Sequence, residues 1–321
     1  MKRYESKPNR TSRGLRLKAA GILCCLAVLA GCGNETLPAA AAKGTRTEWT
    51  ASAEPEAAVN ERTMLFEDTE EGLKAELASG EGQVIVTAGE AFGDGLIQLL
   101  CPDGMRIPCP FTASGREVVL SLPGEGGTFR LDILKRTENT GKYAYVCSSS
   151  FDAGETDGYT PFLLPSYYVN WSSDGPVANK AAELAAESSS DLEFAGKVYD
   201  DIISSYQYDE YAASETHADY VPDPDAFSGE SAGIAYDLAS EMAALLRAGG
   251  VPSRLSVGYS GDTLHVWVSA YLTKAGTVSE VIHSPGREWV LIDPVLGTAN
   301  SPKDIQKYIR DRSNYVLLYN Y

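Results

Sequence analysis

The residue types that could act together in covalent catalysis are gathered in the last third of the chain. Three short motifs follow one another there: Gly233-Ile234-Ala235-Tyr236-Asp237-Leu238-Ala239, His265-Val266-Trp267 and Asp293-Pro294. Covalent catalysis commonly combines a nucleophile, a histidine that accepts its proton and a carboxylate that orients the histidine. The chain offers a histidine and a carboxylate in order, but the methyl side chain of Ala235 has no lone pair with which to attack a carbonyl carbon.

These motifs closely resemble those of the transglutaminase-like superfamily of papain-type cysteine enzymes. The pattern of that family reads Gly-x-Cys-x-x-aromatic-Ala, then His-x-Trp, then Asp-Pro. The resemblance covers roughly residues 178–321, and the segments 242–247 and 250–252 fix its register. It implies that His265 is the base and Asp293 the orienting acid, and that Ala235 stands at the position of the nucleophilic cysteine. It also implies a nucleophile position at the start of a helix, where the helix dipole would stabilise a thiolate.

From this resemblance we expect a catalytically inactive domain that acts by binding a peptide, a cell-wall component or a partner protein. The alternative is an active hydrolase or acyl transferase that uses Ser231, or a cysteine such as Cys147, together with His265 and Asp293. Ser231 precedes Ala235 by four residues, about 6 Å along a helix, and catalysis tolerates little misplacement. A role in capping the helix is therefore the simpler interpretation of Ser231. A third hypothesis makes the domain purely structural.

Aromatic and histidine residues near these motifs have several interpretations. Tyr206, Tyr208, Tyr211 and Tyr220 precede the expected helix, and they could form a binding platform or pack in the core. The chain has three histidines and shows neither HExxH nor CxxC spacing, so we expect no metal site and no cofactor.

The first 31 residues have the pattern of a bacterial lipoprotein signal peptide. A basic segment, 2–18, precedes an apolar run, 19–30, which is too short to span a bilayer as a mature helix. The run ends in Leu29-Ala30-Gly31-Cys32, which resembles a lipobox and implies cleavage before Cys32 and acylation of that residue. A transmembrane anchor is the alternative. We therefore expect a bacterial protein held at the extracytoplasmic face of a membrane by lipid on Cys32.

The net charge of the chain excludes some classes of partner. The net charge of −17 argues against nucleic acid, and also against direct adhesion to anionic lipid, because both need basic patches.

Beyond Cys32, the expected mature chain contains Cys101, Cys109 and Cys147, an odd number. A bridge between Cys101 and Cys109 would be compatible with an extracytoplasmic location. Buried free thiols are the other interpretation.

The chain divides into four parts by composition and pattern: a signal peptide, 1–31; a flexible spacer, 32–63; a β-sandwich-like domain, 64–160; and a transglutaminase-like domain, 161–321. Short apolar runs separated by Gly- and Pro-containing turns predict a small antiparallel sandwich in the third part. Helical periodicity over 178–187, 191–206 and 238–246, followed by strands over 254–258, 265–272 and 288–292, predicts an α+β fold in the fourth.

Overall fold

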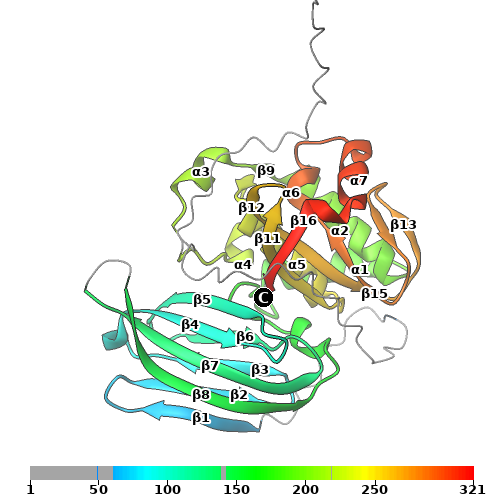
Figure 1. Cartoon of the computed structure of the whole chain (residues 1–321). Coiled ribbons are helices and arrows are strands. Elements are labelled where there is room, and N and C mark those ends of the chain that lie inside the picture. Colours follow the sequence, from blue (N-terminus) through cyan, green and yellow to red (C-terminus); the bar gives the residue numbers. More distant parts are fainter. Residues whose placement is uncertain (1–48, 50–60, 139–141, 218) are drawn as a thin grey trace, which may run out of the picture.

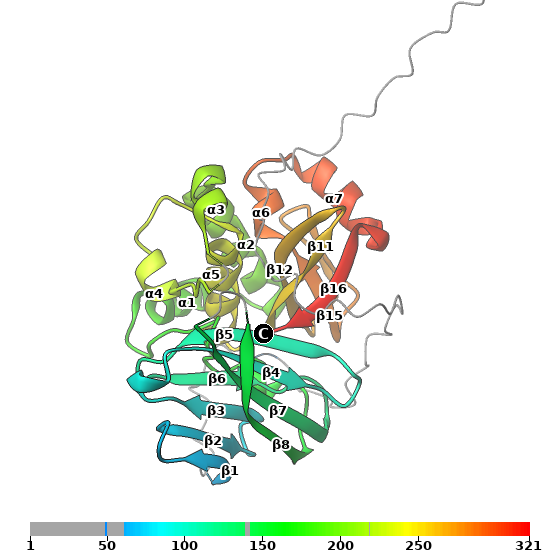
Figure 2. The same cartoon turned by 60° about the vertical axis from the view of Figure 1, so that its left-hand side comes forward.

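A computed structural model of the chain describes residues 49, 61–138, 142–217 and 219–321. They form a mixed α+β structure in which an all-β unit lies against a unit of helices and strands (Figures 1 and 2). The expected α+β class, with antiparallel sheets first and a unit of helices and strands second, is thus confirmed. The expected signal peptide, the lipidation site Cys32 and most of the spacer lie outside the described residues. Among the described helices, none has the length and apolarity needed to span a membrane.

The N-terminal unit consists of two four-stranded antiparallel sheets, with strand orders β1-β2-β3-β6 and β5-β4-β7-β8. Side chains alternate between buried and more exposed positions along β4 and β5, as in strands with one face on a core. Residues of both sheets share one apolar core. The strands are β1 Arg62–Asp68, β2 Leu73–Ala78, β3 Gln83–Thr87, β4 Asp94–Leu100, β5 Arg106–Thr112, β6 Glu117–Ser121, β7 Gly126–Arg136 and β8 Tyr143–Glu155.

Strand β5 is an edge strand that carries two prolines, Pro108 and Pro110. They occupy alternate positions and pair with Gln98 and Leu96 of β4. Backbone N–H groups two residues apart point to the same edge of a strand, so both prolines leave that one edge without a donor. A proline in a sheet is tolerated at such an edge because no ladder hydrogen bond is lost there. This edge faces the second domain, since Pro108 accepts a hydrogen bond on its carbonyl from the hydroxyl of Tyr321.

The three cysteines of the sandwich are free and buried. The bridge considered between Cys101 and Cys109 is therefore not formed. Burial raises the pKa of Cys101 to about 12, and it raises the pKa of Cys109 and Cys147 as well. Thiols with raised pKa values are mostly protonated near neutral pH and are poor nucleophiles.

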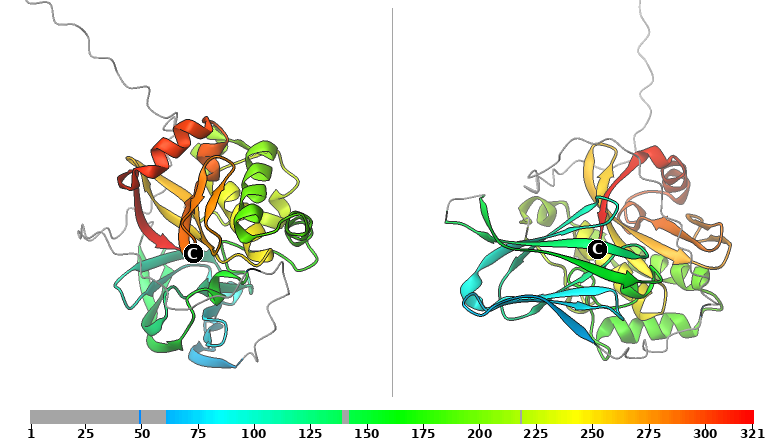
Figure 3. Two further views of the ribbon diagram at one scale, coloured as in Figure 1. Left: turned by 90° about the vertical axis from the view of Figure 1, so that its right-hand side faces the viewer. Right: turned by 60° about the horizontal axis from the view of Figure 1, so that its bottom comes forward.

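The second domain packs helices on one side of a four-stranded antiparallel sheet of order β15-β12-β11-β16 (Figure 3). Its helices are α1 Pro176–Ala186, α2 Asp191–Ser205, α3 Glu210–Glu215, α4 Pro224–Phe227, α5 Ala235–Ala248, α6 Pro294–Gly297 and α7 Pro302–Arg310. Its strands are β9 Gln207–Tyr208, β10 Ala232–Gly233, β11 Ser253–Ser260, β12 Thr263–Leu272, β13 Gly276–Val278, β14 Ile282–Ser284, β15 Glu288–Ile292 and β16 Tyr315–Asn320. Three 3₁₀ turns are η1 Glu90–Phe92, η2 Thr160–Phe162 and η3 Arg312–Asn314.

Helix α5 is the central element of this domain, because most of its side chains are buried. Near its C-terminal end, the buried guanidinium of Arg247 donates hydrogen bonds to the carbonyls of Leu164, Ser253 and Tyr321. It therefore joins the connection from the sandwich, strand β11 and the end of strand β16 at one point. Buried side chains with several satisfied donors restrict the arrangement of the elements they join.

Trp49 lies at the opposite end of α5 from Ala235. Its indole Nε1 donates a hydrogen bond to the carbonyl of Gly249, 3.0 Å away, and its ring stacks on Phe194 with 5.8 Å between centroids. Gly249 permits this packing, since a Cβ atom there would lie 2.1 Å from the ring of Phe194. Trp49, which is far from α5 in sequence, is thereby held at the C-terminal end of the helix.

Candidate functional site

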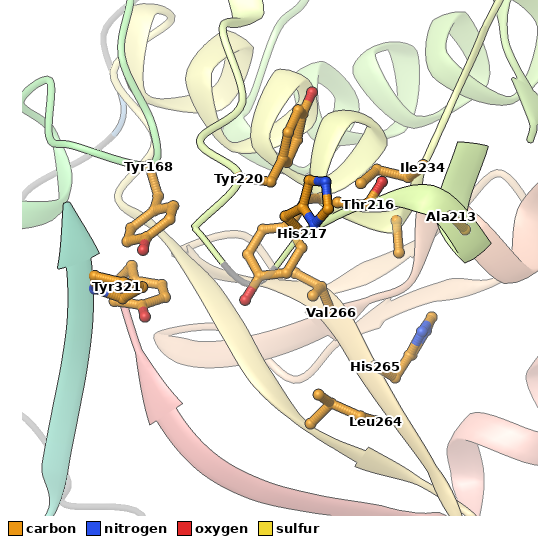
Figure 4. Close-up of a pocket in the computed structure, with 13 residues that line it drawn as sticks. Tyr168, Ala213, Thr216, His217, Tyr220, Ile234, Leu264, His265, Val266 and Tyr321 are labelled. Atoms are coloured by element: carbon orange, nitrogen blue, oxygen red, sulfur yellow. The ribbon is translucent and has the colours of Figure 1, made fainter. Parts of the chain in front are cut away.

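A pocket lies where the N-terminal end of α5 meets strand β12 and the sandwich. It encloses about 600 Å³, including the space open to solvent at its mouth. Figure 4 shows Leu264, His265 and Val266 of β12 on one side, and His217 and Tyr220 of the loop after α3 on the other. Ala235, the first residue of α5, also lines the pocket. The structure therefore brings Ala235 and His265 to the walls of one cavity.

His265 is held by Asp293 beneath this pocket. The imidazole Nε2 lies 2.9 Å from Asp293 Oδ2, and both residues are almost completely buried. Asp293 directly follows strand β15, which pairs with β12, so the sheet fixes the separation of the two side chains. No described residue forms a hydrogen bond with His265 Nδ1.

The carboxylate of Asp293 is surrounded by donors. Oδ1 accepts the backbone N–H of Leu296 at 3.0 Å, which caps helix α6, and Oδ2 accepts the hydroxyl of Tyr315 at 2.7 Å. Burial, followed by the negative charge of Asp293, raises the pKa of Tyr315, so the phenol stays protonated as a donor. An ionised carboxylate only accepts, and His265 Nε2 must then carry the proton. In the neutral imidazole this leaves Nδ1 as the acceptor.

Trp267 and Gly258 complete the packing around His265. The Trp267 ring stacks on the imidazole at 6.3 Å and meets Tyr315 edge-on at 5.1 Å. Gly258 pairs with His265 across β11 and β12, and a Cβ atom there would lie 2.0 Å from the carbonyl of Val316. Glycine at this position therefore lets strand β16 approach closely enough for Tyr315 to reach Asp293.

The start of α5 is held by Asp237. Its carboxylate accepts the backbone N–H of Ile234 at 2.9 Å and the hydroxyl of Tyr220. The N-cap residue itself, Ile234, has no side-chain acceptor for the first turn of the helix. The positive end of the helix dipole is therefore directed at the position of Ala235, which is the environment that a thiolate or a carbonyl oxygen would favour.

The alternative nucleophiles lie away from this pocket. Ser231 is exposed, precedes strand β10 and pairs its carbonyl with the backbone N–H of Gln207 at 3.0 Å. It is not one turn before Ala235 on a helix, because α5 begins at Ala235 itself. Cys147 is buried in strand β8 of the sandwich, and it does not line the pocket either. Neither side chain is placed beside His265.

The four tyrosines considered as a platform have different environments. Tyr206 is buried and stacks on Phe227 at 4.6 Å, and Tyr208 packs partly against the core. Tyr211 is 77% exposed, whereas Tyr220 lines the pocket. The structure thus supports core packing for the first two and a pocket role for Tyr220.

Sequence reasoning missed several pocket residues. His217 lines the pocket, as do Tyr168, Tyr321 and Pro110. They come from distant parts of the chain, and none belongs to a motif that would have marked it. Within the part of the chain that the structure describes, no cluster of three or more His, Cys, Asp or Glu residues could hold a metal ion.

One known family model matches the part of the chain that holds most of this site. Residues 178–294 match the family model of the transglutaminase-like superfamily. A search of curated proteins gives no match. Among solved structures, a candidate cysteine protease from Cytophaga hutchinsonii is 15% identical, with a TM-score of 0.40, and the match covers 75% of this chain and 72% of that one.

Two further structures match less of their own length. A candidate protease from Parabacteroides distasonis is 10% identical with a TM-score of 0.27, covering 63% of this chain and 62% of that one. Red sea bream transglutaminase is 12% identical with a TM-score of 0.24, covering 66% and 47%. These values are too low to carry functional inference, whereas the family match coincides with the helix and strands that build the pocket. Residues 178–294 of this chain form a transglutaminase-like domain.

Proposed function

We propose that this domain is a catalytically inactive transglutaminase-like module that works by binding a peptide. The observation that carries the proposal is the residue at the start of α5: Ala235 lines the pocket beside His265, whose Nε2 is held by Asp293. The position that faces the helix dipole and the base thus carries a methyl group. A methyl group can neither release a proton to an imidazole nor form an acyl intermediate.

The remaining groups suit a ligand that is held and not transformed. His265 Nδ1 can accept a hydrogen bond from an amide, and the start of α5 favours a carbonyl oxygen. Each peptide unit of a ligand offers both an amide N–H for His265 Nδ1 and a carbonyl oxygen for the start of α5. Apart from Thr216 and His217, the other residues that line the pocket are aromatic or aliphatic, which favours a peptide over a heavily hydroxylated glycan.

The test compares the unaltered full-length chain with Ala235→Cys. We expect the unaltered chain to hydrolyse neither generic nor glutamine-containing peptides, and to transfer no acyl group. We expect Ala235→Cys to gain a thiol that reacts with iodoacetamide faster than an ordinary thiol, because the helix dipole and His265 stabilise the thiolate. The double variant Ala235→Cys/His265→Ala is the matched control and should lose this gain. Turnover by the unaltered chain that His265→Ala abolishes would refute the proposal.

We further propose that the protein is a lipoprotein anchored through Cys32. The support is the sequence pattern of a basic segment, a short apolar run and Leu-Ala-Gly-Cys. In a bacterial host, labelled palmitate should be incorporated into the unaltered chain and not into Cys32→Ser. Cys25→Ser, within the apolar run, is the control and should keep its label. Equal labelling of all three proteins would rule out this anchor.

A further inference from the structure

No Asp, Glu, Lys or Arg side chain is among the described residues that line the pocket around Ala235, although the chain carries a net charge of −17. The carboxylates of Asp237 and Asp293 do not line the pocket, and both already accept hydrogen bonds from residues around it. A charged ligand group would therefore lose water in the pocket without meeting an unpaired opposite charge. An uncharged group would gain from contact with the aromatic rings and aliphatic side chains.

One wall of the pocket comes from the sandwich domain. Pro110 of strand β5 lines the pocket together with Tyr168 and Tyr321. Tyr321 is fixed to the same strand through its hydroxyl, which donates to the carbonyl of Pro108. The Tyr168 and Tyr321 rings lie against each other with 4.1 Å between centroids. The proline edge of β5 therefore continues into an aromatic surface of the second domain.

This wall is tied rigidly to helix α5. The backbone carbonyl of Tyr168 accepts the hydroxyl of Ser240, a buried residue of α5, at 2.5 Å. The neighbouring Tyr167 donates its backbone N–H to the carbonyl of Val119 in strand β6, at 2.8 Å. Tyr167 and Tyr168 are thus held by strand β6 of the sandwich on one side and by helix α5 on the other.

We propose that this pocket is a two-domain site for an uncharged aromatic or aliphatic side chain of a peptide, with Pro110 as the wall that sets its size. The proposal rests on the binding function above for the peptide as occupant. The sandwich then has a direct part in ligand selection, since the proline ring supplies one face of the contact. Loss of ring atoms from that face should weaken the contact in proportion to the apolar area removed.

The experiment places a thiol at the pocket and measures which reagents reach it. Full-length Ala235→Cys is treated with methanethiosulfonates that carry benzyl, aminoethyl or sulfonatoethyl groups. The thiolate attacks the divalent sulfur that carries the benzyl, aminoethyl or sulfonatoethyl group, a disulfide to that group forms, the bond to the sulfonyl sulfur breaks and methanesulfinate leaves. Rates are read by mass spectrometry on the peptide that contains position 235, which separates it from the natural cysteines. Ser231→Cys, an exposed position four residues earlier, corrects for intrinsic reactivity and for the net charge of the protein.

After this correction, we expect the benzyl reagent to react at position 235 about tenfold faster than either charged reagent, a preference of about 1.4 kcal/mol. In the Ala235→Cys background, Pro110→Ala should reduce the preference at least about threefold, because a wall of the apolar pocket recedes. Pro108→Ala is the matched control, since the Pro108 ring does not line the pocket and alanine keeps the backbone carbonyl that accepts the Tyr321 hydroxyl. It should leave the preference within about twofold. Pro110→Val provides a second, branched variant if Pro110→Ala fails to fold.

Two results would overturn the proposal. Equal corrected rates for benzyl and charged reagents would show that the pocket does not select uncharged groups. An unchanged preference in both Pro110 variants would show that the sandwich is not a wall of the site. These results differ from those that would refute the proposed inactivity. Turnover by the unaltered chain would refute inactivity, but it would not change the preference of position 235 for the benzyl reagent.

Discussion

Glu241 provides a direct test of whether the core of the second domain buries an ionisable side chain away from water. It lies on α5, is 1% exposed, and its Oε2 has no hydrogen-bond partner among the described residues. Burial raises the pKa of Glu241 to about 8, and the negative charges of Asp225 and Asp201 act in the same direction. Hydroxyl groups of Ser228 and Tyr206 offset part of the effect. The folded protein therefore favours the protonated acid.

The sign of the effect on stability follows from proton binding. Between the ordinary pKa of 4.5 and the folded value of about 8, the folded state binds more protons than the unfolded state. Stability from this group is therefore complete below pH 4.5 and is lost as the pH rises toward 8. The loss is about 1.4 kcal/mol for each pH unit, or about 5 kcal/mol over the interval.

Glu241→Gln removes the titration and keeps the shape of the side chain. Urea unfolding of the full-length chain at pH 5, 6.5 and 8 measures the free energy of unfolding. We expect the two proteins to differ by no more than about 1 kcal/mol at pH 5, and the glutamine variant to be more stable by several kcal/mol at pH 8. Glu183→Gln, whose side chain is 66% exposed on α1, is the control and should show no such trend. A stability difference that stays constant from pH 5 to 8 would refute the reasoning.

Three further substitutions test the packing around the helix and the site, each by the free energy of unfolding in urea. Tyr315→Phe removes one of the hydrogen bonds to the buried carboxylate of Asp293 and should cost about 1.5–3 kcal/mol; an unchanged stability would mean that the phenol does not hold the acid. Gly249→Ala places a methyl group 2.1 Å from the ring of Phe194 and should cost about 1–3 kcal/mol; a stabilised variant would contradict the close approach. Trp49→Phe keeps the ring stack but loses the indole donor, so we expect a cost of about 1 kcal/mol, and no cost would show that the hydrogen bond is absent in solution.

Local patterns predicted helices α1, α2 and α5 of the second domain, but not the shorter helices α3, α4, α6 and α7. The apolar spacing of Phe194, Val198 and Ile202 predicted a helix over 191–206, and the structure has α2 at Asp191–Ser205. A short-range signal is sufficient there, because one helix face packs on the core. Strand β12 was expected over 265–272 and occupies Thr263–Leu272.

Other features depend on contacts that no local pattern reveals. Strand β5 could not be predicted from its sequence, because Pro108 and Pro110 are typical of turns. The structure places both prolines on the edge of a sheet, where they are tolerated. Tyr315 reaches Asp293 only because β16 pairs with β11, and Tyr321 reaches the pocket at the end of the same strand. The position of Ala235 was predicted from a motif, whereas the walls around it are made by tertiary structure.

The contacts of Trp49 place it at the end of helix α5 opposite the pocket. Helix α5 separates Gly249, where Trp49 is bound, from Ala235 by 14 residues, a span of about 20 Å. If Cys32 carries the proposed lipid, the tether reaches the described domain at Trp49, at the end of α5 that lies away from the pocket. The point of attachment and the binding site would then lie at opposite ends of the same helix.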